Sequence, residues 1–474
     1  MKSCLPVRAF LTLCLGALAL AAAQPAAAQL QTPDRRVPSA NDLRLSYAPV
    51  VKHVAPAVVN VYAARVVRNR NPFFDDPVFR RFFGVPDGAG GSQIQRALGS
   101  GVIVDPSGLI VTNVHVIEGA DEIKVALPDK REFEATVVLK DQRTDLAVLR
   151  IKHDNDRFPF LELGNSDALE VGDVVLAVGN PFGVGQTVTH GIVSALARTD
   201  VGSSNYQFFI QTDAAINPGN SGGALVDLDG KLIGINNMIL SRSGGSQGIG
   251  FAIPSNMVRV VVASAKSGGS AVRRPWLGAT LQTVTPDIAD SMSLKRPSGA
   301  LISSIMRDGP AARAGLKVGD VIVSIDGQEV DDSNTFDYRF ATKPLGGSAK
   351  LGVIRAGRDM VSNIALETAP DSPRDEITIQ SRSPLSGAKV ANLSPALADE
   401  LQLKNIDQGV VILETDNGSY ASNLGFQRGD VIEEVNGTHI AKTRDLESAT
   451  KTPNRAWRIV IVRRGQKISA MFGG

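Results

Sequence analysis

Short apolar stretches separated by turn residues fill the chain between residues 58 and 254. They are rich in β-branched residues and bounded mostly by Gly, Pro, Asp or Asn, as strands are. The clearest are 58–67, 101–104, 109–114, 146–151, 174–178, 187–195 and 208–211. Many short strands without long helices favour a barrel or a sandwich.

A helical stretch follows these strands at Asn256–Lys266. Ser255 is predicted to cap its start, and Gly268 with Gly269 to end it. The next residues, Gly-Gly-Ser and then Arg273-Arg274-Pro275, are typical of a linker. The strand-rich part of the chain is therefore predicted to end here.

The last 200 residues contain an internal repeat. Residues 319–327, Gly-Asp-Val-Ile-Val-Ser-Ile-Asp-Gly, recur in similar form as residues 429–437, at an offset of 110 residues. Each copy ends in two predicted strands around a turn. We predict tandem domains over 274–370 and 384–474, joined by a polar, proline-containing linker at 371–383.

The first 28 residues are typical of a secretory signal peptide. Lys2 and Arg8 precede an apolar run at 9–22, and Ala26-Ala27-Ala28 fits a cleavage site. The apolar run is short for a membrane span. We expect cleavage near Ala28, export to the periplasm, and a polar N-terminal arm over 29–48.

Removal of that segment changes what the composition implies. Cys4 and Cys14 are the only cysteines, so the mature chain would have neither disulfides nor cysteine-bound metal. Loss of Lys2 and Arg8 lowers the formal net charge from +2 to 2 − 2 = 0. There is no basic run, phosphate-binding loop or paired histidine spacing. We expect no cofactor, no metal and no nucleic-acid partner.

A serine on a glycine-rich turn, Gly219-Asn220-Ser221-Gly222-Gly223, is the main candidate for chemistry. His115 and Asp145 precede it, in Thr-Asn-Val-His and Thr-Asp-Leu-Ala. A serine hydroxyl needs a base to take its proton, and a histidine base needs a third group to orient it. The order His, Asp, Ser is that of chymotrypsin-like proteases.

The same glycine motif also fits the nucleophile elbow of α/β-hydrolases. That fold requires a helix after the serine and a histidine later in the chain. Residues 224–235 instead form two apolar runs around Asp229-Gly230, which predicts a hairpin, and the only later histidine is His439. A plain turn at 219–223 is the remaining alternative.

With these motifs and the repeat, the chain resembles the HtrA family of exported serine proteases, most closely its DegP/DegQ-type members. Four further stretches carry the resemblance, at 99–103, 179–183, 210–217 and 250–255. The resemblance implies a mostly β fold, with a chymotrypsin-like double β-barrel protease domain over 49–268 and two PDZ domains.

The resemblance also implies roles for the candidate residues. His115 would be the general base, Asp145 would orient it, and Ser221 would attack the scissile carbonyl. The backbone amides of Gly219 and Ser221 would form the oxyanion hole. Asn220 stands where digestive proteases carry an aspartate that pairs with a new N-terminus, so activation through loop ordering is expected rather than clipping.

Substrates would lie extended along the edge at 232–236, with a primary pocket for small aliphatic side chains. The candidate substrate-binding residues are Ile216, Asn217, Leu232, Gly234, Ile235 and Asn236. The first PDZ domain would hold a C-terminal carboxylate with the backbone of Trp276, Leu277, Gly278 and Ala279. Leu385-Ser386-Gly387-Ala388 is a weaker match in the second, which leaves a structural or assembly role open there.

Residues 71–84 hold five phenylalanines. The resemblance implies that they contact neighbouring subunits in a homotrimer that can form larger cages; a local hydrophobic cluster is the alternative. The implied function is ATP-independent degradation of misfolded periplasmic proteins by a serine endopeptidase with chaperone activity, and peripheral membrane association stays open. The alternatives are chiefly a chaperone or tethering protein, or a regulatory protease with one partner.

Overall fold

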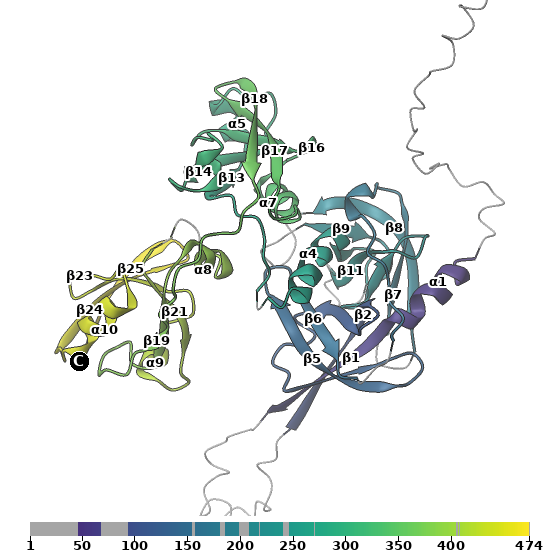
Figure 1. Ribbon diagram of the computed structural model, residues 1–474, viewed down its shortest axis with the longest axis horizontal. Helices are drawn as coiled ribbons and strands as arrows, with labels where there is room; N and C mark the ends of the chain where they lie inside the picture. The colour runs from purple at the N-terminus through teal and green to yellow at the C-terminus, as the bar shows by residue number, and fades with distance from the viewer. Residues whose placement is uncertain are drawn as a thin grey trace, which may run out of the picture. The chain divides into compact units, whose positions relative to one another are not determined.

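A computed structural model describes residues 46–67, 93–153, 157–180, 185–198, 208–217, 219–239, 246–269, 271–403, 406 and 408–473 (Figure 1). The chain divides into two units, Met1–Tyr47 and Ala48–Gly474, and the second holds all the described helices and strands. Within the described residues, no helix is long and apolar enough to cross a bilayer. The predicted signal peptide and the phenylalanine-rich segment 71–84 lie outside the described residues.

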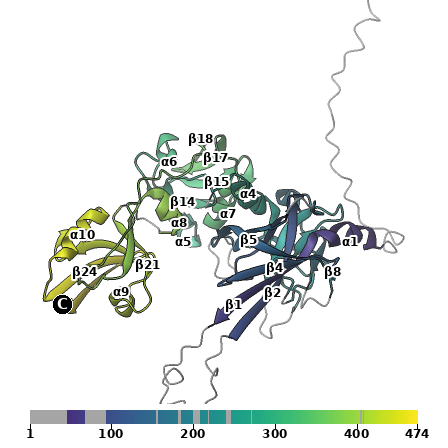
Figure 2. The ribbon, with the colours of Figure 1, turned by 60° about the horizontal axis from the view of Figure 1, so that its bottom comes forward.

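Six strands form the first closed barrel, in the order β1-β2-β3-β6-β5-β4. A short helix α1 (Ala48–Val54) and a 3-10 turn η2 (Ala55–Ala57) lead into it. β1 and β2 pair along their length and extend as a two-stranded ribbon (Figures 1 and 2). The strands are β1 (Val58–Val67), β2 (Gln93–Asp105), β3 (Leu109–Asn113), β4 (Glu122–Ala126), β5 (Glu132–Asp141) and β6 (Leu146–Ile151).

Six more strands close a second barrel in the order β10-β11-β12-β9-β8-β7, after the 3-10 turn η3 (Ser166–Ala168). The predicted double β-barrel and the hairpin after the serine are confirmed, because β10 and β11 pair around a turn at Gly230. The strands are β7 (Val174–Gly179), β8 (Thr187–Arg198), β9 (Phe209–Thr212), β10 (Ala224–Val226), β11 (Leu232–Ile239) and β12 (Gly250–Pro254).

Helix α4 (Ser255–Lys266) follows the second barrel, and its buried face includes Val258 and Val261. The prediction that Ser255 caps this helix is wrong. Pro254 is the N-cap residue and supplies no side-chain hydrogen bond. The Ser255 hydroxyl is buried and donates to the carbonyl of Gly164 at 2.9 Å, so it fastens the helix to the barrel.

The first of the two predicted PDZ domains is a sheet in the order β13-β14-β15-β17-β18, with β16 paired to β15. Helix α7 packs over β13, β14 and β15. Its elements are β13 (Ala279–Thr283), α5 (Pro286–Ser291), β14 (Ala300–Ile305), α6 (Pro310–Arg313), β15 (Val321–Ile325), β16 (Gln328–Glu329), α7 (Ser333–Ala341), β17 (Ser348–Arg355) and β18 (Arg358–Ala365).

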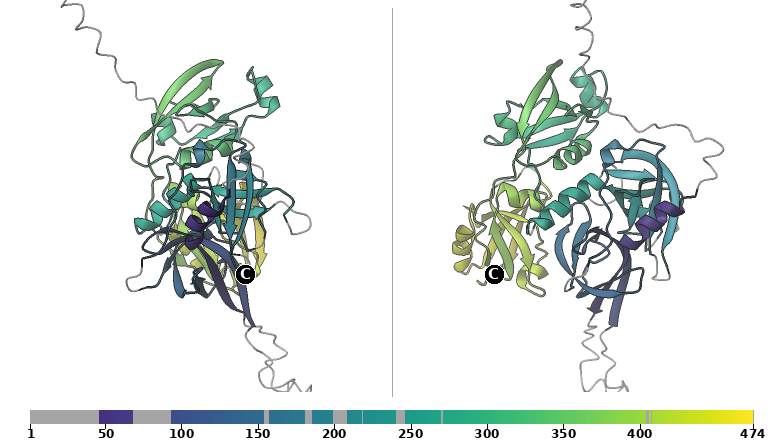
Figure 3. Two further views of the ribbon diagram at one scale, coloured as in Figure 1. Left: turned by 90° about the vertical axis from the view of Figure 1, so that its right-hand side faces the viewer. Right: turned by 45° about the vertical axis from the view of Figure 1, so that its right-hand side comes forward.

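The second copy has the order β19-β20-β21-β22-β24-β25, with β23 paired to β22, and Figure 3 shows it in green to yellow from two further sides. β19 lies in the segment predicted as a linker. The elements are β19 (Ile377–Thr378), β20 (Ala388–Asn392), α8 (Pro395–Glu400), β21 (Val410–Thr415), α9 (Tyr420–Asn423), β22 (Val431–Val435), β23 (Thr438–His439), α10 (Thr443–Lys451), β24 (Ala456–Arg463) and β25 (Gln466–Gly473).

The repeated Gly-Asp motif has the same structural use in both copies. Asp320 is 1% exposed and accepts two hydrogen bonds from Arg355, each at 2.6 Å. Asp430, also 1% exposed, accepts the same pair from Arg463 at 2.6 Å. Bidentate arginine–carboxylate pairs are the strong ones, because both N–H bonds are charge-assisted. The repeat is therefore a structural anchor of each domain.

Candidate active site

The first barrel supplies the histidine and the aspartate. His115 follows the end of β3, and Asp145 lies in the tight turn between β5 and β6 with a φ of 57°. Aspartate is among the residues that tolerate this left-handed conformation. The Asp145 carbonyl accepts hydrogen bonds from the Val114 amide at 3.1 Å and the Asn113 side chain at 3.0 Å. Two adjacent turns are thereby joined.

The two side chains are paired as the sequence predicts. His115 Nδ1 lies 2.6 Å from Asp145 Oδ2, and the His115 backbone N–H donates to Asp145 Oδ1 at 3.0 Å. The histidine side chain is 45% exposed and the aspartate side chain 20%. One edge of the imidazole is thus held while the ring stays open to solvent.

The serine loop of the second barrel is clamped between its own strands and the first barrel. The Gly222 N–H donates to the Asn236 carbonyl at 2.8 Å, and the Asn236 N–H donates to the Gly223 carbonyl at 2.9 Å. On the other side, the Ser100 N–H of β2 donates to the Ser221 carbonyl at 2.8 Å. Glycine is required at 222, because a Cβ there would lie 2.1 Å from the Ser100 carbonyl oxygen.

Asn237 connects the serine to the aspartate, and the sequence reasoning missed it. Its side-chain amide donates to Asp145 Oδ2 at 2.8 Å, while its carbonyl accepts the Ser221 hydroxyl at 3.0 Å. This buried asparagine of β11 therefore links Ser221 to Asp145, which in turn holds His115. No local motif marks this residue; only the position of the expected hairpin strand after the serine could have suggested it.

The Ser221 hydroxyl is directed to the Asn237 carbonyl rather than to the His115 ring. The proton that a base has to remove is therefore held by another acceptor in this structure.

Gly219, the predicted oxyanion residue, has a φ of 100°. Its carbonyl accepts the Ser100 hydroxyl at 2.7 Å, and the same hydroxyl oxygen accepts the Asn180 N–H at 2.9 Å. Ser100 thereby ties the turn before the nucleophile to β2 and to the end of β7. Ser100 lies in the stretch 99–103 that carried the family resemblance, although no role was assigned to it.

The prediction of a free strand edge at 232–236 is wrong. β11 lies inside a closed barrel, where Ile235 pairs with Ala224 on one side and Ile253 on the other. The side chains of Leu232, Ile235 and Asn236 are fully buried. The alternation of apolar residues here reflects the barrel core. Gly234 is likewise paired with Leu225 and Pro254.

The pairing of β10 with β11 covers residues 224–226 of β10, whereas β11 continues to Ile239. From Asn237 onward, β11 has only β12 as a neighbour among the described strands. Ile216 is 1% exposed and lies beside Gly250, where a Cβ would approach it to 2.8 Å. Asn217 is exposed and accepts the Ser246 N–H at 3.1 Å.

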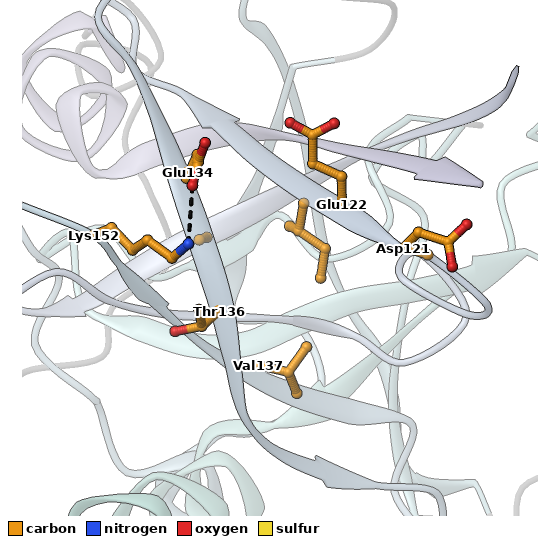
Figure 4. A pocket seen from close by; sticks show the side chains of 9 residues that line it. Asp121, Glu122, Glu134, Thr136, Val137 and Lys152 are labelled. Carbon is orange, nitrogen blue, oxygen red and sulfur yellow. Dashed lines mark hydrogen bonds and ion pairs between the residues drawn. The ribbon is translucent and has the colours of Figure 1, made fainter. Parts of the chain in front are cut away.

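Figure 4 shows a separate hollow on the first barrel, lined by Ala120, Asp121, Glu122, Ile123, Glu134, Ala135, Thr136, Val137 and Lys152. Glu134 and Lys152 form an ion pair at 2.9 Å across it, and this hydrogen bond lowers the pKa of Glu134. None of the candidate site residues lines the hollow, so it belongs to a different part of the barrel surface.

Comparison with known proteins agrees with this geometry. Residues 99–235 match the trypsin-like peptidase domain family, and residues 301–355 match the PDZ domain family. The probable DegP-like periplasmic serine endoprotease of Halomonas elongata is 40% identical over 421 residues, or 84% of this chain and 86% of the relative. The periplasmic serine endoprotease DegP of Escherichia coli K12 is 40% identical over 423 residues, or 85% and 86%.

A solved structure of the HtrA-type protease AlgW with a decapeptide superposes with a TM-score of 0.52 at 47% identity, covering 69% of this chain and 100% of that one. This chain belongs to the HtrA family. It is a serine endopeptidase whose trypsin-like domain is followed by PDZ domains.

In this HtrA protein, residues 276–279, which the sequence predicts as a carboxylate loop, end at the start of β13. The carbonyls of Leu277 and Gly278 accept hydrogen bonds from Ala311 and Met306, each at 2.9 Å. A trans peptide points its N–H opposite to its carbonyl. The following amides, those of Gly278 and Ala279, therefore face away from α6. Trp276 is tied to β18 through its N–H and the carbonyl of the nearby Glu367 at 2.8 Å.

Proposed function

We propose that this HtrA protease degrades misfolded exported proteins without ATP, through His115, Asp145 and Ser221. The contact between His115 Nδ1 and Asp145 Oδ2 at 2.6 Å is the observation that carries the proposal. Asp145 fixes the tautomer in which Nδ1 bears the proton, so Nε2 is left as the base. Ser221 attacks the scissile carbonyl after a rotation away from Asn237, and His115 then protonates the leaving amine.

The amides of Gly219 and Ser221 stabilise the oxyanion in this mechanism. Ser100 supports them by holding the Gly219 carbonyl at 2.7 Å, so the turn is prepared before the substrate arrives. An extended substrate pairs with the free side of β11 at residues 237–239, and Ile216 with Asn217 borders the pocket for its small aliphatic side chain.

The experiment is cleavage of casein and of a chemically denatured protein by the full chain and by Ser221→Ala. We expect the substitution to lower turnover by about 10⁶-fold. Cleavage by Ser221→Ala at the rate of the unmodified protein would reject the assignment. A C-terminal apolar peptide, added separately, tests whether the first PDZ domain recognises chain ends at residues 276–279 and whether occupancy raises the rate.

A chaperone or tethering role is the second candidate, favoured by the Ser221 hydroxyl bonded to Asn237 at 3.0 Å instead of to the base. A protease in that arrangement holds substrate without cutting it. Suppression of aggregation to the same degree by the full chain and by Ser221→Ala, without fragments, would support this role. If the full chain cleaves the substrate into fragments as fast as aggregation disappears, this role is excluded.

Export and assembly complete the proposal. The segment 1–28 directs the chain to the periplasm and is removed near Ala28, which N-terminal sequencing of the exported protein tests.

Homotrimers that can form larger cages assemble through the phenylalanine-rich segment 71–84. Sedimentation of a variant with Phe82 and Phe83 changed to serine is the matching test, and unchanged assembly would remove this role.

A further inference from the structure

The outer edge of the second PDZ sheet is already occupied by the chain itself. β20 pairs with β21 on one side and with β19 on the other, with Ile377 opposite Val390 and Thr378 opposite Lys389. The matching strand of the first PDZ domain, β13, pairs with β14 and has no second strand beside it among the described residues. The two domains therefore differ at the edge where PDZ domains add a peptide strand.

The residue after β19 makes the backbone contacts of a ligand's last residue. The Ile379 N–H donates to the Ala388 carbonyl at 2.9 Å, and the Ile379 carbonyl accepts the Gly387 N–H at 2.8 Å. Gly387 occupies the place of Gly278 in the first domain, because its carbonyl accepts the Asp416 N–H at 2.9 Å as the Gly278 carbonyl accepts that of Met306. A loop amide that would receive a terminal carboxylate oxygen thus receives a main-chain carbonyl.

The side chains fit the same interpretation. Ile379 is 2% exposed and belongs to the domain's hydrophobic core together with Leu385 of the loop and Leu446 of α10. Ile377, two residues earlier and hence on the same face, packs against this core from the edge. Two alternate apolar side chains enter the core beside the strand and helix that flank a PDZ groove.

The edge strands of the two domains, β20 and β13, differ in how far their side chains are buried. Ala388 and Val390 of β20 are 0% exposed. The corresponding residues of β13, Ala279 and Leu281, are only half-buried. The edge strand of the first domain is thus left partly uncovered where that of the second is sealed.

The segment before β19 is fastened at several points, so its position is not a chance contact. The Asn392 N–H at the end of β20 donates to the Arg374 carbonyl at 2.7 Å, and Lys389 pairs with Glu376 at 2.7 Å. A tethered segment of this kind competes with free ligand at an effective concentration in the millimolar range.

We propose that the second PDZ domain is a binding site for chains ending in an apolar residue, and that residues 377–379 fill it as an internal ligand, with Ile379 in the place of the terminal side chain. This inference rests on the proposed recognition of C-termini by the PDZ domains. A free chain end binds there only when the internal segment leaves, whereas the first domain is open.

The test uses the full chain carrying Ser221→Ala, to prevent cleavage, and Gly278→Glu, to block the first domain. Gly278 has a φ of 70°, and a Cβ there would lie 2.9 Å from Gly309, so a side chain is not accommodated. The probe is a fluorescent peptide of residues 370–379, Pro-Asp-Ser-Pro-Arg-Asp-Glu-Ile-Thr-Ile, with a free C-terminus. Fluorescence anisotropy measures its binding.

Ile379→Ser is expected to increase peptide affinity by about tenfold or more, since that is the scale on which an isoleucine side chain favours its buried state. Ile379→Val is the matched control and should increase affinity by at most a few-fold, since it removes only one buried methyl group. Tryptophan emission reports whether the variant is folded, because Trp457 is 1% exposed in this domain and Trp276 is common to the parent and the variant. A folded Ile379→Ser protein that binds no peptide overturns the proposal.

A disulfide gives a second measurement in the Ile379→Ser chain. Thr378→Cys with Lys389→Cys places two thiols at directly opposed positions of β19 and β20, and Cys4 and Cys14 are changed to serine. We expect peptide binding in the reduced protein and its loss on oxidation. Equal binding in both states places the peptide elsewhere and overturns the proposal.

If Ile379→Ser unfolds the domain, the proposal can still be tested on the chain with Ile379 intact. Millimolar peptide should speed hydrogen exchange at the Ile379 amide by displacing β19, and no change would overturn the inference. The proposed peptide recognition by the first domain is tested by a different measurement. There, peptide should bind to the chain with Gly278 intact and should no longer bind to this domain in Gly278→Glu.

Discussion

A buried ion pair close in sequence to Asp145 gives the sharpest stability prediction. Arg274 Nη2 donates to Asp141 Oδ2, with Nη1 and Oδ1 3.5 Å apart, and both side chains are 6% exposed. Asp141 also accepts the hydroxyl of Thr144, the residue immediately before Asp145. The arginine therefore acts on the turn that carries Asp145, the proposed triad aspartate.

Replacing Arg274 by methionine keeps most of the side-chain volume and leaves the Asp141 carboxylate buried without its cation. Removing one partner of a buried pair costs about 3–5 kcal/mol. For a domain of 150–250 residues, each kcal/mol lowers the melting temperature by roughly 2–4 °C, so we expect a decrease of about 6–20 °C. The turn at Asp145 also loosens, and turnover at 25 °C should fall.

Calorimetry of the full chain, with peptide cleavage measured far below the transition, tests this reasoning. Arg273→Met is the matched control, because Arg273 is the exposed neighbour and should change the melting temperature little. Adding Asp141→Leu to Arg274→Met should recover stability, since no unpaired charge remains buried. A decrease below about 2 °C for Arg274→Met, equal to that of the control, would refute the argument.

Three further predictions follow from the same geometry. Asn237→Leu removes the amide that donates to the triad aspartate at 2.8 Å, so kcat/KM for a peptide substrate should fall by about 10- to 100-fold, with the fold retained by circular dichroism. Burial tends to raise the pKa of Asp105, but hydrogen bonds from Lys266 and Ser107 outweigh it and lower this pKa to about 2. A depressed carboxyl pKa stabilises the fold above the unfolded value and loses this effect as the pH falls, so Asp105→Asn should cost roughly 1–2 kcal/mol in urea unfolding at pH 7 and progressively less below pH 4. Gly222→Ala should abolish cleavage and destabilise the protease domain, whereas Gly172→Ala, also at positive φ but with open space around it, should show the backbone cost alone.

Local patterns were sufficient for much of the fold. The predicted strands 58–67 and 146–151 coincide with β1 and β6, because their boundaries carry turn residues and their interiors are β-branched. β2 begins well before the predicted start at residue 101. Gly101 suggests a strand end in the sequence, but a Cβ there would lie 2.7 Å from Ile110, so glycine is needed for close packing inside the barrel.

The pairing of His115 with Asp145 was predictable from motifs, whereas its surroundings were not. Asn237 acts on Asp145 because β11 of the second barrel passes the β5–β6 turn of the first, and that proximity has no local signature. The same absence explains the wrong edge at 232–236: a run of alternate apolar residues does not show how many neighbours the strand has, and barrel closure gives β11 two. Arg274, predicted in a linker, is buried by its ion pair with Asp141. Because the two residues are 133 positions apart in sequence, no local pattern indicates this contact.

The two copies of the repeat also differ in a way that the repeated residues do not show. Its shared residues, including Asp320 and Asp430 with their arginines, make the two PDZ domains alike in everything that builds the sheet. The feature that separates them lies outside the repeat, in Ile377 and Ile379 of a segment that is otherwise polar. Two apolar residues do not predict a strand, because a strand this short is stable only when it pairs with the edge of an existing sheet. The difference between an open and a filled peptide site therefore depends on the connecting segment, and exchanging residues 371–380 for a glycine-serine chain of equal length should make the second domain resemble the first.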